Sequence, residues 1–145
     1  MSVVKWQTPA AIASLLTTGL NSLANNGYAV SAAVDNDTGK HRYADFELVA
    51  TYGTNPSAGA FVSLFLVESV DGTNYADGDA SIAPPATALI GIFPIRAVTT
   101  AQRVAIRQVA LSPFKFKIVI RNETGQAMAA SGNTVKYCTY NEEVV

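Results

Sequence analysis

Hydrophobic and polar residues alternate with a period of two along much of this chain, as in strands that bury only one face. Residues 114–121 are the clearest case, with apolar side chains at the even positions and basic ones at most of the odd positions. Residues 42–52 alternate similarly and place Asp45 and Glu47 on the polar face. Residues 61–70 are apolar on both faces, which predicts a strand that is central or covered on its outer face.

Turn signals separate these apolar runs. Asp71 and Gly72 end the doubly apolar run, and comparable clusters of small polar residues occur at 35–39 and 122–125. The connections are too short for the crossovers of a parallel sheet. We therefore predict an all-β protein of seven or eight antiparallel strands, a sandwich or barrel, in a single domain over residues 1–145.

One segment near the N-terminus has a helical pattern instead. Thr8 and Pro9 are typical of a helix start, apolar residues then recur at helical spacing, and Gly19 suits a C-terminal cap. This predicts a short helix over residues 9–18. Residues 1–7 before it are expected to form a strand or an arm laid on a neighbouring molecule.

Charge is scarce in this sequence. Only 14% of the 145 residues are charged, against about 25% in an ordinary soluble domain, so we expect another protein to cover part of the surface. The net charge of −1 gives no general attraction to nucleic acid or anionic membranes, and no apolar run is long enough for a membrane helix. No signal peptide is evident. The single cysteine, Cys138, excludes an intrachain disulfide, as is typical of proteins made in a reducing cytosol.

Few residues suggest catalysis. His41 is the only histidine and is expected to be a solvated loop residue, so we expect no histidine base paired with a nucleophile. Asp45 and Glu47 project from one strand face, and paired carboxylates can hydrolyse glycosidic bonds. No aromatic cleft is predicted around them, which favours a solvated or partner-facing pair. We expect no enzymatic activity and no cofactor.

The acidic loop that follows the doubly apolar strand is the stretch that most suggests a calcium site. Calcium takes about six to eight oxygen ligands, and the order of acidic residues here does not match an EF-hand. Short Asp and Asn side chains also favour turns by bonding to their own backbone. No metal is therefore expected, with Asp71, Asp77 and Asp79 as the weak candidates.

Two features suggest contacts with other molecules. A basic row on residues 114–121 could meet phosphates, an acidic protein patch or only water, and the lack of interleaved aromatics favours solvation or a protein contact. Trp6 either seals its own sandwich or anchors the N-terminal arm in a neighbour. The candidate contact residues are Trp6, Val62, Leu64, Leu66, Lys115, Lys117 and Arg121.

Four stretches, in this order, resemble a family of small virion structural proteins of tailed bacteriophages. They are Leu20–Asn25, Tyr43–Leu48, Ser69–Gly78 followed by Pro84-Pro85, and Gly125–Asn133. The resemblance implies a jelly-roll-like β-sandwich in the virion, made in the host bacterial cytoplasm. The first expected function is head decoration: a cement protein that self-associates, as a trimer, and stabilises the assembled head by binding the major capsid protein. A tail or connector position is the second.

The stretch Ser69–Tyr75 also resembles the Ser-x-Asp-Gly-x-Asn-aromatic turn of discoidin-like carbohydrate-binding sandwiches. It supports an alternative function, a carbohydrate-binding module on the virion surface. Such a module would be expected to group exposed aromatic residues, such as Tyr43, Tyr52 and Tyr75, on one face.

Overall fold

The computed structural model describes all 145 residues, and its regular structure is almost entirely β. The strands are β1 (Val4–Trp6), β2 (Ala13–Leu16), β3 (Tyr28–Val30), β4 (Tyr43–Ala50), β5 (Phe61–Ser69), β6 (Leu89–Pro94), β7 (Gln102–Ala110), β8 (Lys115–Glu123), β9 (Thr134–Tyr140) and β10 (Glu142–Val144). The helical turns are α1 (Asn36–Gly39) and two 3-10 turns, η1 (Thr18–Leu20) and η2 (Ala86–Ala88). None of these helices is long or apolar enough to cross a membrane.

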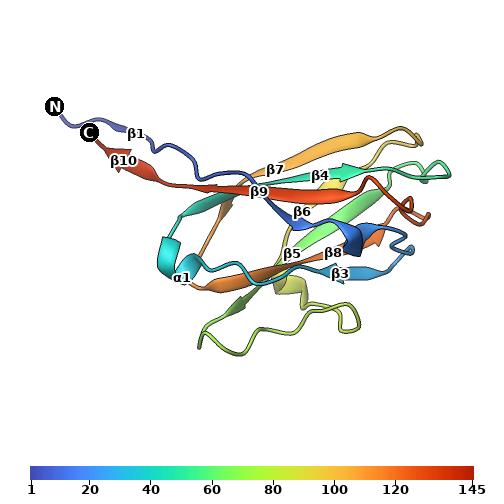
Figure 1. Cartoon of the computed structure of the whole chain (residues 1–145), viewed down its shortest axis with the longest axis horizontal. Coiled ribbons are helices and arrows are strands. Elements are labelled where there is room, and N and C mark those ends of the chain that lie inside the picture. The colour runs from blue at the N-terminus through green and yellow to red at the C-terminus, as the bar shows by residue number, and fades with distance from the viewer.

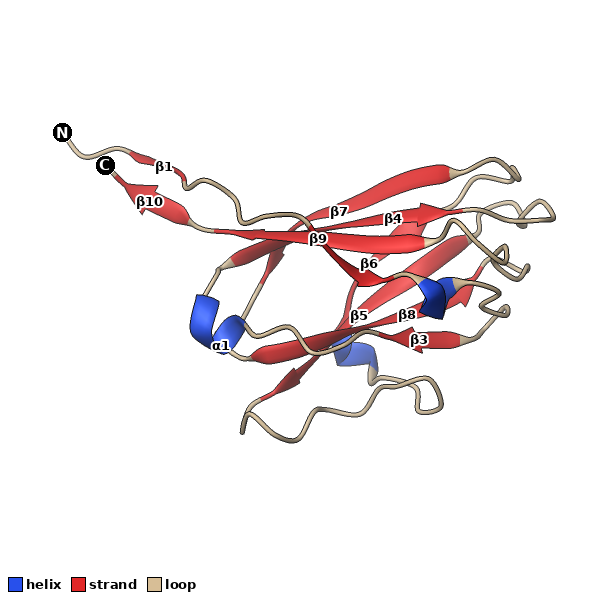
Figure 2. Cartoon of the chain, viewed as in Figure 1, coloured by secondary structure: helices blue, strands red, loops and turns tan.

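Eight of the strands form two antiparallel sheets that pack face to face, as Figures 1 and 2 show. One sheet has the order β2-β9-β4-β7 and the other the order β3-β8-β5-β6. When these eight strands are counted along the chain, the first, eighth, third and sixth form one sheet, and the second, seventh, fourth and fifth form the other. That is the strand order of a jelly roll. The predicted all-β antiparallel sandwich of jelly-roll type is confirmed.

The core lies between the two sheets and follows the alternation seen in the sequence. Phe46 and Leu48 of β4 face Leu64 of β5 and Ile118 and Ile120 of β8, and none of these side chains has any exposed surface. Each fully buried side chain of this size contributes ~1.5–3 kcal/mol relative to an exposed one. The polar positions of β4 therefore point away from the core, and this fixes the outer face of its sheet.

The doubly apolar strand β5 is central in its sheet, and its second face is also covered. Phe65 and Val67 form a small cluster that packs against Tyr28, Val30 and Ala88. Ala88 belongs to the long connection between β5 and β6, so the chain itself covers this face. Another molecule is not needed to explain why the strand is apolar on both sides.

The predicted contact role of three β5 residues is wrong. Val62 and Leu64 have no exposed surface and Leu66 is 9% exposed, because all three point into the core between the sheets. A side chain in this position has no surface to offer to a partner. The other four predicted contact residues, Trp6, Lys115, Lys117 and Arg121, keep some exposed surface.

The helix expected over residues 9–18 does not form. Residues 13–16 are strand β2, which pairs with β9, and the Ala10 N–H donates to the carbonyl of Thr139 over 2.9 Å. Only η1 turns helically. A helix this short is marginal by itself. The extended segment forms backbone hydrogen bonds with the edge of β9, which would otherwise lack a neighbouring strand. It also buries Leu16 and Leu20 in the core, so tertiary pairing overrides the local helix signals.

Residues 1–7 do form an arm, and it is paired within the chain. β1 and β10 make a two-stranded antiparallel ribbon that extends beyond the sandwich, with both termini side by side at its tip (Figure 1). A Lys5–Glu143 ion pair of 3.4 Å crosses the ribbon. Val4 and Val144 stay exposed on it. Self-association as a trimer stays a prediction.

Candidate functional site

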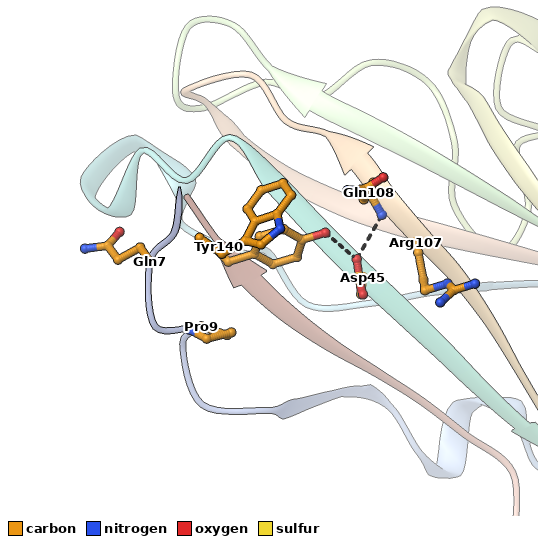
Figure 3. A pocket seen from close by; sticks show the side chains of 7 residues that line it. Gln7, Pro9, Asp45, Arg107, Gln108 and Tyr140 are labelled. Carbon is orange, nitrogen blue, oxygen red and sulfur yellow. Dashed lines mark hydrogen bonds between the residues drawn. The ribbon is translucent and has the colours of Figure 1, made fainter. Parts of the chain in front are cut away.

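The outer face of the β2-β9-β4-β7 sheet carries two adjoining depressions of about 870 and about 220 Å³. Asp45 and Arg107 line both, so we treat them as one groove with a first and a second part. Figure 3 shows the first part, which is lined by Trp6, Gln7, Pro9, Asp45, Arg107, Gln108 and Tyr140. The second part is lined by Ile12, Asp45, Phe46, Glu47, Ala105, Arg107, Lys136, Tyr137 and Cys138.

Three aromatic rings form a cluster at one end of the groove. Tyr43 of β4 and Tyr140 of β9 are direct cross-strand partners, and their rings stack at 5.8 Å. Trp6 meets both rings edge-on, at 5.7 and 5.4 Å. The Gln7 N–H donates to the carbonyl of Asn141 over 2.9 Å, which sets Trp6 at the end of β9. Trp6 remains 50% exposed, so this aromatic cluster offers ring surface to a ligand.

Asp45 lies beside the aromatic cluster and is held in place by two donors. The Tyr140 hydroxyl donates to Asp45 Oδ1 over 2.7 Å, and the Gln108 N–H donates to the same oxygen over 2.8 Å (Figure 3). Burial, together with the hydrogen bond and charge of Asp45, raises the pKa of Tyr140 to about 12. The phenol therefore stays a hydrogen-bond donor at neutral pH, and Asp45 Oδ2 is left to accept from a ligand.

A β-bulge places two residues of β7 opposite Asp45. Ala44 pairs with Val109 and Phe46 with Ile106, so Arg107 and Gln108 share the one position between them. Gln108 has φ of +54°, a left-handed conformation that is uncommon for a residue with a side chain. Bulges and such backbone conformations are frequent next to functional sites. Here the bulge turns the Gln108 N–H toward Asp45.

The second part of the groove is more strongly charged. Glu47 pairs with Arg103 at 2.6 Å. An exposed pair of this kind adds only ~0–1 kcal/mol to stability, but it fixes the carboxylate. The Cys138 thiol lies 3.0 Å from the carbonyl of Ala10, and burial, followed by the charge of Asp45, raises its pKa. The thiol therefore stays protonated and is a poor nucleophile.

The predicted basic row lies on the other sheet, away from the groove. Lys117 sits over the ring of Tyr75 at 4.3 Å, and Arg121 pairs with Glu123 at 3.0 Å. Lys115 is half-buried on the same strand. Two of the three cations are thus partnered within the domain, and none of the three joins the groove.

The acidic loop residues serve as turn caps. Asp71 Oδ1 accepts from the backbone N–H groups two and three residues later, at 2.8 and 2.7 Å, and Asp79 does the same at 2.6 and 2.7 Å. These hydrogen bonds lower the pKa of both carboxyls, with the Asn74 side chain giving the largest effect on Asp71. Asp77 lies between these two turns. Nowhere does the structure gather three or more His, Cys, Asp or Glu side chains as a metal site would require.

The expected grouping of Tyr43, Tyr52 and Tyr75 is wrong. Tyr52 is 1% exposed in the core and Tyr75 covers Lys117 on the other sheet, so only Tyr43 reaches the aromatic cluster. The sequence did contain a signal for the true cluster. Tyr43 alternates with Asp45 on one outward face, and Tyr140 alternates with Cys138 on another, but the register that joins these faces is not visible in the sequence.

The burial of Tyr52 has a consequence for stability in alkali. Burial raises its pKa to about 12, whereas the unfolded chain titrates near its ordinary value of 10.0. Above that value protons leave the unfolded state first, so stability is fully present below pH 10 and falls as pH rises toward about 12. We expect a falling Tm over this range by circular dichroism. Tyr52→Phe should lose less stability between pH 9 and 11.5 than the wild type, and equal slopes would contradict this.

No protein-family model matches this chain, and no curated protein is significantly similar to it. Several solved carbohydrate-binding modules have similar folds. The C-terminal family 6 module of LamC, a laminarinase from Zobellia galactanivorans, has a TM-score of 0.49 at 8% identity, covering 96% of this chain and 99% of its own. A family 35 module of Abf62 from Cellvibrio japonicus gives 0.48 at 13%, covering 100% and 96%. A family 36 xylanase module from the Trinervitermes trinervoides hindgut metagenome gives 0.46 at 13%, covering 97% of each chain.

These comparisons overturn the predicted membership in a family of tailed-phage virion proteins. The similar solved structures are carbohydrate-binding modules, and neither a family model nor a curated protein supports a phage family. The short stretches that suggested the resemblance are mostly turns and one alternating strand, which many β-sandwiches share. At identities this low the likeness concerns the fold alone.

Proposed function

We propose that this domain is a non-catalytic carbohydrate-binding module and that the groove is its saccharide site. The observation that carries the proposal is a partly exposed aromatic cluster, with Trp6 as its most exposed ring, directly beside a fixed carboxylate, Asp45, in an open groove. Sugar rings present apolar C–H faces and a rim of hydroxyls. Aromatic surface next to a few well-placed polar groups is the arrangement that such a ligand requires.

The polar groups of the first part complement sugar hydroxyls. Asp45 Oδ2 is an acceptor without a protein donor, while the Gln7 and Gln108 amides and the Arg107 guanidinium supply donors. Neighbouring hydroxyls of a sugar ring both donate and accept, so one ring can use an acceptor and a donor together. Asp45 lies on β4, and Arg107 and Gln108 lie on β7. Their attachment to paired strands keeps these groups in position before binding, which lowers the entropy cost of binding.

The non-catalytic part of the proposal is supported by the carboxylates of the groove. Glycosidases use two carboxyl groups that act on one bond as acid and base or nucleophile. Both carboxylates of the groove have partners in the domain: Glu47 pairs with Arg103, and Asp45 accepts from Tyr140 and Gln108. His41, the only histidine, does not line the groove. These features support a binding role.

The test is direct binding of the purified domain to a broad glycan array and to insoluble polysaccharides in sedimentation assays. We expect retention on at least one polysaccharide class, with a loss of retention when the same free oligosaccharide competes. No binding across plant, microbial and animal glycans would contradict the proposal. Release of reducing sugar from the bound polysaccharide would contradict the non-catalytic role.

A further inference from the structure

The groove holds two cations that have no partner in the domain. Of its carboxylates, Glu47 is neutralised by Arg103, and Asp45 Oδ1 accepts two hydrogen bonds. The four ion pairs of the structure involve neither Arg107 nor Lys136, and neither side chain makes a hydrogen bond to the protein. The second part of the groove therefore has positive charge available to a ligand.

The two cations stand on opposite sides of the central strand of the groove. Lys136 of β9 lies directly opposite Glu47 of β4, and Arg107 occupies the bulge of β7 opposite Asp45. Both line the second part of the groove, and Arg107 also borders the first. In Figure 3 the Arg107 side chain extends away from Tyr140, so the charge lies beyond the aromatic cluster.

We propose that the groove selects acidic saccharides, with one ring on the aromatic cluster and the anionic group of a neighbouring residue between Arg107 and Lys136. This inference rests on the proposed function. Guanidinium groups bind carboxylate and sulfate oxygens through two parallel N–H···O bonds, and an ammonium adds a point charge. Asp45 balances one of the two positive charges, so a neutral sugar would leave the groove with one positive charge in excess. The anion is a carboxylate, as in a uronic acid, or a sulfate ester.

The experiment compares one polysaccharide with and without its charge. Polygalacturonate and its carboxyl-reduced form share the same backbone linkage, and a sulfated galactan supplies the other anion. Isothermal titration calorimetry is expected to show affinity for an acidic polymer about tenfold above that for the reduced one. That affinity should fall as salt rises from 20 to 300 mM, because the contact is between partly exposed charges.

Variants separate a specific contact from general attraction. Lys136→Gln is expected to lower affinity for the acidic polymer about tenfold and to leave affinity for the reduced polymer unchanged, since Lys136 lines only the second part of the groove. Arg107→Gln also removes a donor to sugar hydroxyls, so it is expected to lower affinity for both polymers, with a loss about tenfold larger for the acidic one. Arg96→Gln is the matched control, since it removes the same charge from an exposed residue outside the groove. An equal loss in Arg96→Gln would mean that attraction is general and would overturn the inference.

The remaining outcomes distinguish this inference from the proposed function. Equal affinity for the acidic and reduced polymers would overturn acidic selectivity while leaving a carbohydrate-binding module in place. Binding to neither of them, nor to any glycan of the array, would remove the proposed function and the inference with it. A preference for the sulfated over the carboxylated polymer supports the inference and identifies the anion as sulfate.

Discussion

Trp6→Ala is expected to lower saccharide affinity about thirtyfold, equivalent to ~2 kcal/mol, which is typical of an aromatic residue that anchors a ligand. The indole is half-exposed at the mouth of the groove, where it offers the largest ring of the aromatic cluster. Its removal also loses two edge-on ring contacts, each worth ~0.5–1.5 kcal/mol. Calorimetry against the best ligand from the glycan array measures the change.

Two control measurements test whether the effect of Trp6→Ala comes from the aromatic cluster. Tyr75→Ala removes a half-buried aromatic from the loop after β5, where it packs against Lys117 of the other sheet, and should leave affinity unchanged. Thermal unfolding should show that Trp6→Ala remains folded, since the indole lies outside the core of the sandwich. Unchanged affinity in Trp6→Ala, with the protein folded, would mean that the aromatic cluster is not the saccharide platform.

Asp45→Ala is expected to weaken saccharide binding severely and to lower stability by about 2 kcal/mol. The substitution removes the acceptor for the Gln108 N–H and the Tyr140 hydroxyl, and hydrogen bonds to a charged group are worth ~1.5–3 kcal/mol. Without this acceptor, the left-handed conformation of Gln108 has nothing to offset its strain. Affinity should fall about a hundredfold because the ligand acceptor and the shape of the bulge are both lost.

Asp45→Asn separates the two roles of this residue. The amide oxygen can still accept from both donors, so stability should stay within about 1 kcal/mol of the wild type, while the charge is lost. The pKa of Tyr140 should fall from about 12, because part of its elevation comes from the Asp45 charge; burial, the larger cause, remains. Ultraviolet titration of the phenols detects that shift. If Asp45→Ala bound saccharide as tightly as the wild type, Asp45 would have no place in the site.

The alternation in the sequence predicted most of the sandwich. The pattern at 42–52 identified both the buried and the outward face of β4, and the structure places the faces as expected. It could not identify the strand order, because alternation describes one strand at a time. The bulge at Arg107 and Gln108 was likewise hidden, since neither residue is a glycine that would mark a left-handed position.

The predictions that failed did so because of contacts between residues that are far apart in the sequence. The helix signals around Thr8 and Pro9 were real but local, and pairing with β9, more than a hundred residues later, overrides them. The doubly apolar β5 suggested a protein contact, yet the chain's own connection to β6 covers it. The site was missed for a similar reason. Trp6 reaches Tyr140 only because the two ends of the chain pair as a ribbon.

That ribbon brings the two ends of the polypeptide together. The Val3 N–H donates to the carbonyl of Val145 over 2.8 Å, and the reciprocal bond measures 3.0 Å. A short flexible bridge between them would close the backbone into a ring without straining the sandwich, and new ends could be opened in the exposed loop at 53–55. A circular permutant of this kind should keep the jelly roll. Strand β1, which carries Trp6, would then be covalently connected at both of its ends. For the same reason, the domain can be inserted as a unit into a surface loop of another protein.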